Sequence, residues 1–125
     1  MTPEAREKAR ASQRKWKAAH PDHNRTYYLQ NRGKIRERQW EYDLMRCYGL
    51  TRQQYNEMLV AQGGVCRICT ERSATKLSVD HDHSSGRIRA LLCHQCNLAV
   101  AHVKENPARA IAAADYLIAH GKVAP

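Results

Sequence analysis

The sequence predicts a small α+β protein in which a zinc-stapled ββα core lies between a basic helical N-terminal arm and a C-terminal helix. Two observations lead to this fold class. Cysteines occur in two pairs with metal-ligand spacing, and two stretches of alternating apolar residues flank a short turn. With 125 residues and no phenylalanine, the apolar core must be small, so a metal cross-link would compensate for it. We expect an arm over residues 1–50, the core over 51–105 and the last helix over 106–125.

The arm contains twice as many Lys and Arg residues as Asp and Glu, in a chain of net charge +9. Pro21 and Gly33 are expected to divide it into short helical units. The charge favours a polyanionic partner, with nucleic acid ahead of an anionic membrane, although a merely soluble surface would show the same excess. The candidate phosphate-binding residues of the arm are Arg14, Lys15, Lys17, Lys34, Arg36 and Arg38.

The core is expected to open with a helix from residue 52. Thr51 is a suitable N-cap, Gln54 completes a T-x-x-Q capping box, and Gly63 provides a C-terminal stop. Tyr55 and Leu59 share one face of this helix. That face should pack against the segment that carries the first cysteine pair.

Residues 77–92 have the pattern of a β-hairpin. Leu77, Val79 and His81 alternate on one side before a Ser-Ser-Gly turn, and Ile88, Ala90 and Leu92 alternate after it. A helix is expected after Cys93, and Asn106-Pro107 ends it and begins the last helix. The buried side of that last helix is predicted to consist of Ile111, Ala114, Leu117 and Ile118.

Four of the five cysteines form the pairs Cys66-x2-Cys69 and Cys93-x2-Cys96, separated by 23 residues. The sequence lacks an apolar run of membrane-spanning length and a signal-peptide pattern, which favours a reducing cytosol and therefore metal ligands over disulfides. Four thiolates fill a tetrahedral Zn²⁺ shell, so this zinc is predicted to be structural. The fifth, Cys47, is expected to be a small buried apolar residue.

The remaining ligand-type side chains gather at the end of the first strand and the start of the next helix: Asp80, His81, Asp82, His83 and Asn97. A carboxylate and an amide oxygen suit Mg²⁺ or Mn²⁺, and an adjacent imidazole can deprotonate a water molecule. Strand alternation places Asp80 and His81 on opposite faces, so the strand must end or bulge there. Asp82 is expected to be structural. The alternative is that these residues have no catalytic role and only cap turns or face solvent.

The stretches YGLT...Y...L...QGGVCRIC and VDHDHSSGRIRALLCHQCN, within residues 48–101, resemble the phage recombination endonuclease VII type of HNH nuclease in the ββα-metal (His-Me finger) superfamily. The resemblance implies Zn²⁺ on the four paired cysteines and a catalytic Mg²⁺ on Asp80 and Asn97. It implies His81 as general base and His83 as the residue that orients or polarises the scissile phosphate. Val100 stands where the founding member carries an acidic residue.

The function predicted on this basis is metal-dependent hydrolysis of DNA phosphodiester bonds, by nicking or cutting of duplex or branched DNA. Arg87 and Arg89 would grip phosphates near the site or only solvate a strand edge. A zinc nucleobase deaminase is excluded because no histidine is followed two positions later by glutamate. A non-catalytic zinc DNA-binding or adaptor protein remains the alternative. The resemblance further implies phage packaging or recombination proteins as partners and allows a homodimer. No membrane partner is expected, because the sequence has no apolar run of membrane-spanning length.

Overall fold

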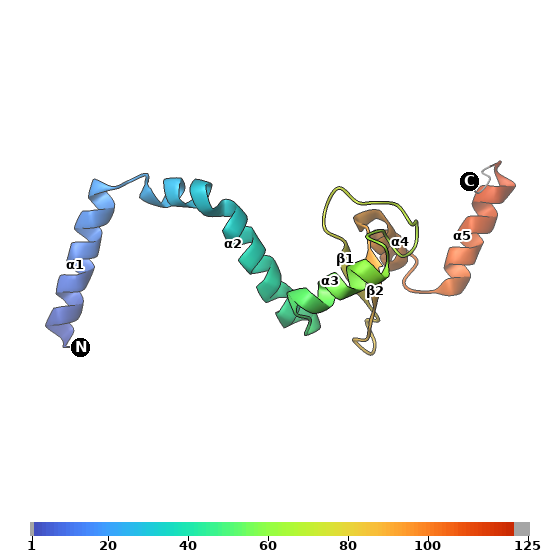
Figure 1. Cartoon of the computed structure of the whole chain (residues 1–125), viewed down its shortest axis with the longest axis horizontal. Helices are drawn as coiled ribbons and strands as arrows, with labels where there is room; N and C mark the ends of the chain where they lie inside the picture. The colour runs from blue at the N-terminus through green and yellow to red at the C-terminus, as the bar shows by residue number, and fades with distance from the viewer. Residues whose placement is uncertain (1, 122–125) are drawn as a thin grey trace. The chain divides into compact units, whose positions relative to one another are not determined.

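The computed structural model of the chain describes residues 2–121 and has an α+β fold of five helices and one two-stranded antiparallel sheet (Figure 1). The chain divides after Asp43 into two compact units. The elements in order are α1 (Pro3–Ala19), α2 (His23–Tyr48), α3 (Arg52–Ala61), β1 (Ser78–His81), β2 (Ile88–Leu92), α4 (His94–His102) and α5 (Pro107–Ala119). The predicted fold class is therefore confirmed. Among residues 2–121, no helix has the length and apolar character that crossing a membrane requires.

The first unit consists of α1 and most of α2. Thr2 caps α1 by accepting a hydrogen bond from the Ala5 backbone N–H (3.3 Å), and α1 buries no residue. Pro21 lies in the turn between α1 and α2, as predicted. The predicted break at Gly33 is wrong, because α2 continues through it. A single glycine costs a helix only about 1 kcal/mol, which the good helix formers around it can offset.

Helix α3 begins as the sequence predicts. Thr51 and Gln54 form both hydrogen bonds of the capping box, and Gly63 follows the helix with a φ of 70°. Tyr55 is buried, and its hydroxyl donates to the Leu77 carbonyl (2.8 Å), while burial raises the pKa of this phenol. At the end of the helix, Gln62 accepts from the Leu91 N–H (2.8 Å) and donates to the Leu91 carbonyl (2.9 Å). These bonds tie α3 to β2.

Strands β1 and β2 form the predicted antiparallel hairpin, and their pairing register shifts between Asp80 and His81. Asp80 pairs with Ala90, but His81 pairs with Ile88, so Arg89 on β2 has no residue opposite it. The bulge predicted at Asp80 and His81 is confirmed. The predicted alternation of β2 fails at its end, since Leu91 and Leu92 are both buried. The reason is that α3 and α4 both pack against β2.

The apolar core is small and lies in the second unit. Its buried residues are Leu44, Tyr55, Cys66, Leu77, Val79, Leu91 and Leu92. The predicted burial of Cys47 is wrong: this cysteine is exposed, because α2 buries only Leu44. Such a core favours a cross-link that stabilises the fold independently of apolar burial.

Helix α5 has the predicted start but not the predicted buried side. Asn106 caps it by accepting from the N–H groups of Ala108 and Arg109. The residues expected to be buried are exposed, with exposed fractions of 62% for Ile111 and 51% for Leu117, and Ala114 and Ile118 are exposed as well. The prediction is wrong because α4 and α5 leave an apolar groove of about 620 Å³ between them instead of closing over these side chains.

Asp82 in the hairpin turn is expected to make the free energy of unfolding depend on pH in the acidic range. Asp82 Oδ1 accepts hydrogen bonds from the Ser84 N–H (2.8 Å), the Ser84 hydroxyl (2.6 Å) and the Ser85 N–H (2.9 Å), and these bonds lower the pKa of Asp82. A lowered pKa in the folded state adds stability above the unfolded pKa of about 4 and loses it as the pH falls through the folded value. Asp82→Asn should lower the melting temperature at pH 7 and flatten its decline below about pH 4. Thermal unfolding followed by circular dichroism from pH 7 to pH 2.5 checks this, and an unchanged pH profile would contradict it.

Candidate active site and zinc knuckle

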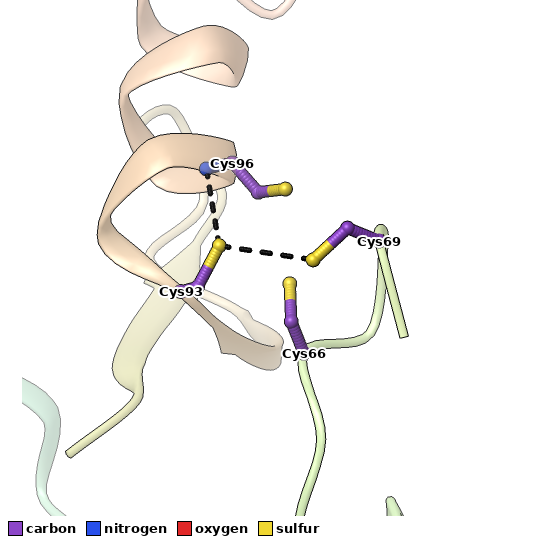
Figure 2. Close-up of side chains that lie close together, drawn as sticks. All are labelled: Cys66, Cys69, Cys93 and Cys96. Atoms are coloured by element: carbon purple, nitrogen blue, oxygen red, sulfur yellow. Dashed lines mark hydrogen bonds between the residues drawn. The ribbon is translucent and has the colours of Figure 1, made fainter. Parts of the chain in front are cut away.

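The four paired cysteines converge on one point (Figure 2). All four Sγ atoms lie within 4.8 Å of one another, and Cys69 Sγ is 3.9 Å from Cys93 Sγ. A tetrahedral zinc with Zn–S bonds of about 2.3 Å places its sulfurs about 3.8 Å apart, so the observed spacing fits Zn²⁺. We call residues 66–69 together with residues 93–96 the zinc knuckle.

Backbone hydrogen bonds position each cysteine pair. In the first pair, the Cys66 N–H donates to the Glu71 carbonyl (3.0 Å) and the Thr70 N–H donates to the Cys66 carbonyl (3.0 Å), which closes a tight turn. The Arg67 N–H donates to the Leu91 carbonyl (3.1 Å) and so fixes this turn to β2. In the second pair, Cys93 is the N-cap of α4, and its sulfur accepts from the Cys96 N–H (3.4 Å).

The thiols of the knuckle differ in their proton affinity. Burial acts against ionisation of Cys66, but hydrogen bonds from the backbone of Cys93, Cys69 and Ile68 lower its pKa to about 6. Burial and the three neighbouring sulfurs raise the pKa of Cys96 to about 12. Four thiolates this close repel one another, and a divalent cation between them removes that repulsion. The donor set is therefore that of a closed, structural zinc site.

Beside the knuckle, four of the predicted site residues line a single pocket of about 240 Å³: Asp80, His81, His83 and Asn97. Asp80 and His81 come from β1, His83 from the turn after it, and Asn97 from the first turns of α4. Cys96 belongs to the knuckle and directly precedes Asn97. A metal bound by the knuckle would therefore fix Asn97 relative to the hairpin. Asp82 is not among the lining residues and acts in the turn.

The bulge explains how two successive strand residues share this pocket. In a regular strand, the side chains of Asp80 and His81 would point to opposite faces. The irregular register between them turns both toward the same space. The His81 ring is then enclosed by two edge-to-face contacts, with the ring centroids of Tyr48 at 5.5 Å and His83 at 4.8 Å.

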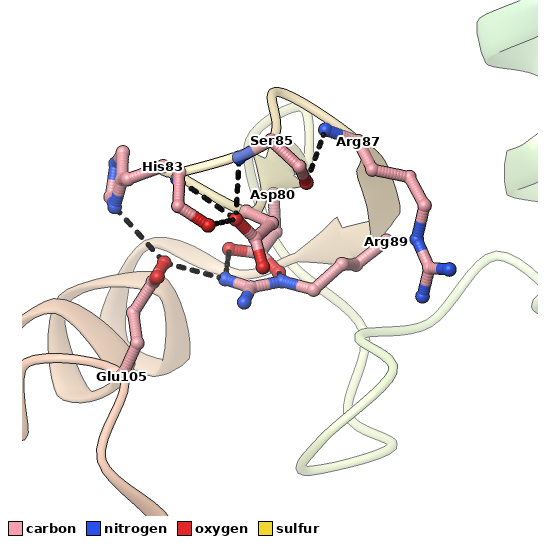
Figure 3. Close-up of polar contacts among 8 residues, drawn as sticks. Asp80, His83, Ser85, Arg87, Arg89 and Glu105 are labelled. Carbon is pink, nitrogen blue, oxygen red and sulfur yellow. Dashed lines mark hydrogen bonds and ion pairs between the residues drawn. The ribbon is translucent and has the colours of Figure 1, made fainter.

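A chain of polar contacts links Asp80, Arg89, Glu105 and His83 (Figure 3). Arg89 binds both oxygens of Asp80, with Nε 2.6 Å from Oδ2 and Nη2 2.9 Å from Oδ1. Arg89 Nη2 also donates to Glu105 Oε1 (2.9 Å), and the same oxygen lies 2.9 Å from His83 Nδ1. The hydrogen bonds to Asp80, followed by those to Glu105, raise the pKa of Arg89. Arg89, the unopposed residue of the bulge, thus forms a bidentate ion pair with Asp80, and each carboxylate oxygen keeps a further lone pair for a cation.

Tyr48 and Glu105 also line the pocket, and neither was among the predicted site residues. Partners of Asn97 were expected only on the next turn of its helix, where Val100 and Ala101 line the pocket without a ligating atom. Glu105 lies beyond the end of α4 and returns to the pocket through the turn. A signal was present in the sequence, since Glu105 is the only acidic residue between Asp82 and Asp115.

The remaining candidate residues lie outside the pocket. Arg87 is exposed on the hairpin, and its backbone N–H donates to Ser85 Oγ (3.3 Å). In the arm, Arg14 pairs with Glu7 (2.8 Å). All the predicted phosphate-binding residues of the arm are exposed on α1 or α2, namely Arg14, Lys15, Lys17, Lys34, Arg36 and Arg38. The structure therefore leaves their charges accessible to solvent.

The chemistry available in the pocket follows from its donor atoms. The Asp80 carboxylate and the Asn97 amide oxygen are hard oxygen ligands that fit Mg²⁺ or Mn²⁺, with open positions for water and an anionic oxygen. The imidazoles of His81 and His83 line the same pocket, and imidazole is a common general base or acid in catalysis. A carboxylate, an amide oxygen and two imidazoles in one pocket are a donor set of the kind that suits metal-assisted hydrolysis of a phosphate ester.

Comparison with known proteins gives one family and two phage relatives. The family described as recombination endonuclease VII matches residues 41–119, which is more than half of the chain. Over 60 residues the chain is 45% identical to the Gene 59 protein of Mycobacterium phage L5 and 43% identical to that of Mycobacterium phage D29. These matches cover 46% of this chain, but only 37% and 36% of the two relatives. No solved structure matches. The matched region contains the knuckle and the whole pocket, and the chain belongs to the recombination endonuclease VII family.

Proposed function

We propose that this protein is a metal-dependent DNA endonuclease of the HNH, His-Me finger type that hydrolyses phosphodiester bonds by a one-metal mechanism. The observation that carries the proposal is the shared pocket of Asp80, His81, His83 and Asn97 beside the zinc knuckle. Membership of the endonuclease VII family supports DNA as the substrate. Duplex and branched DNA are both candidate forms of it.

Each pocket residue has a role in this mechanism. His81 accepts a proton from the attacking water, and its contacts with Tyr48 and His83 restrict the motion of its ring. His83 orients the scissile phosphate. Asp80 and Asn97 would hold Mg²⁺ or Mn²⁺, which would supply positive charge for the phosphate and the leaving 3′ oxygen.

The two hairpin arginines have different proposed roles. Arg89 is engaged by Asp80 and Glu105, which favours a role in holding the pocket together over one in gripping a distant phosphate. Arg87 is exposed on the same hairpin and remains a candidate for phosphate contact. The hairpin would thus present one arginine to the DNA and keep the other for the site.

The basic arm is proposed to bind the DNA backbone. Replacing Arg14, Lys15 and Lys17 together with alanine should weaken duplex binding and reduce the slope of log K against log salt by about 0.9 for each phosphate that these side chains neutralise. Alanine favours helix formation, so α1 should persist in this variant. Fluorescence anisotropy of a labelled duplex over a series of NaCl concentrations measures the slope. An unchanged affinity and slope would show that these side chains do not bind phosphate.

The setting of the activity is also a proposal. We propose that the protein acts in the cytosol of a phage-infected bacterium, as a homodimer, together with proteins of phage DNA packaging or recombination. The phage relatives support this setting. Analytical ultracentrifugation measures the oligomeric state directly.

The alternative function is non-catalytic, zinc-dependent DNA binding. A protein of this kind would use the knuckle and the arm but would not need the pocket. The deciding experiment incubates the zinc-loaded protein with supercoiled plasmid in Mg²⁺, in Mn²⁺ and without added divalent cation, beside an Asn97→Ala variant. The zinc content is measured before and after. Nicking or linearisation that requires the divalent cation and Asn97 supports the nuclease. A shift in plasmid mobility without cutting in any metal would establish the alternative.

A further inference from the structure

Glu105 contacts His83 directly and Asp80 through Arg89. Its Oε1 lies 2.9 Å from His83 Nδ1 and 2.9 Å from Arg89 Nη2, and Arg89 in turn binds both oxygens of Asp80. The Glu105 side chain is only 23% exposed, whereas the His83 side chain is 66% exposed. The carboxylate is therefore the better-fixed partner of the two.

The backbone that places Glu105 in the pocket is conformationally strained. Lys104 and Glu105 have φ values of 54° and 53°, in the left-handed region that residues with a Cβ atom rarely adopt. The turn is closed by bonds from the Lys104 N–H to the Ala101 carbonyl (2.9 Å) and from the Glu105 N–H to the Val100 carbonyl (3.1 Å). Glycine would adopt both conformations without strain. Strained residues of this kind concentrate at functional sites.

We propose that Glu105 is a positioning residue for the nuclease proposed above: its carboxylate fixes the ring of His83 and, through Arg89, the carboxylate of Asp80. This inference rests on the proposed function. The turn after α4 holds Glu105 against the hairpin, so one side chain sets the orientation of a residue on the hairpin turn and of another on β1.

The effect on His83 follows from the chemistry of imidazole. Hydrogen bonding of Nδ1 to Glu105 leaves Nε2 as the nitrogen that can reach a substrate phosphate. Without the carboxylate, a ring that is two-thirds exposed would rotate among several orientations. Carboxylates that orient a metal-bound histidine typically contribute about 10- to 100-fold to metal affinity or activity, and we expect an effect of the same order for a histidine that contacts phosphate.

The test compares Glu105→Ala and Glu105→Gln with the wild-type protein in steady-state cleavage of a labelled duplex at saturating Mg²⁺. We expect Glu105→Ala to lower kcat by roughly 10- to 100-fold with little change in KM. Glu105→Gln keeps a hydrogen-bond acceptor and should restore part of the loss. The losses of Glu105→Ala and His83→Ala should not multiply in the double variant, because part of the action of Glu105 passes through His83; any loss beyond that of His83→Ala alone measures its action through Arg89 on Asp80. Full additivity of the two losses would overturn the proposed action through His83.

Lys104→Gly is the matched control, because it relieves the same kind of strain one residue away and keeps the carboxylate. It should retain activity, and every variant should retain one zinc and the wild-type circular dichroism spectrum. If the wild-type protein cuts and Glu105→Ala cuts equally fast, the role of Glu105 is wrong and the nuclease proposal stands. If the wild-type protein does not cut in any metal, the nuclease proposal itself fails.

Discussion

Cys66→Ser is expected to unfold the second unit of the protein. Cys66 is fully buried, and its sulfur belongs to a cluster whose members come from two segments of the chain. Structural zinc sites contribute about 10–16 kcal/mol of apparent free energy at pH 7, which matches or exceeds the whole stability of a typical domain. Loss of one thiolate should therefore remove the zinc, the cooperative thermal transition and the pocket together.

Cys47→Ser is the matched control for this experiment. Cys47 is exposed and lies outside the cluster, so its replacement should preserve one zinc per chain and the wild-type melting temperature. Atomic absorption gives the zinc content, and circular dichroism with thermal unfolding gives the structure. A Cys66→Ser variant that keeps a wild-type melting temperature without zinc would show that the small apolar core is sufficient by itself. Removal of zinc by a strong chelator should reproduce the effect in the wild-type protein.

His81→Ala is expected to lower kcat for DNA cleavage by about 10²- to 10⁴-fold, the usual contribution of a general base. DNA affinity should be almost unchanged, because exposed cations elsewhere supply most of the attraction for phosphate. Fold and zinc content should also be retained, since His81 lies outside the buried core. Single-turnover cleavage of a labelled duplex at several pH values, together with zinc analysis, measures the effect.

His120→Ala provides the control, since it makes the same substitution at the end of α5, outside the pocket. It should cut at the wild-type rate. Equal cutting by His81→Ala and the wild-type protein would remove His81 from the mechanism and leave His83 as the imidazole to test next.

Structural features that depend on a short local motif could be predicted from the sequence. Two cysteine pairs indicated the knuckle, T-x-x-Q indicated the start of α3, and alternation around Ser-Ser-Gly indicated the hairpin. The bulge was predicted from chemistry, because one pocket could hold both Asp80 and His81 only if the strand was irregular. The roles of Asp80, His81, His83 and Asn97 stay predictions, although the structure brings their side chains together.

Features that depend on packing between distant segments could not be predicted. The apolar pattern of α5 gave no information on whether another element would cover it, and Cys47 looked as apolar as a buried residue. Gly33 showed that a helix breaker is overridden when its neighbours favour the helix. Glu105 reaches the pocket only because two non-glycine residues take left-handed conformations, which no sequence pattern indicates.

The hairpin lies between the two cysteine pairs in the sequence, so a metal bound by both pairs would join the ends of the segment that contains it. This arrangement limits the positions at which residues can be inserted. Residues 72–76 lie between the knuckle and β1, outside both the cysteine cluster and the pocket. Doubling the length of such a loop costs only about 0.6 kcal/mol in closure entropy. One residue added to β1 or β2 would instead shift the pairing and exchange the two faces of the strand. Insertions are therefore expected to be tolerated at 72–76 and to destroy the site when placed within the strands.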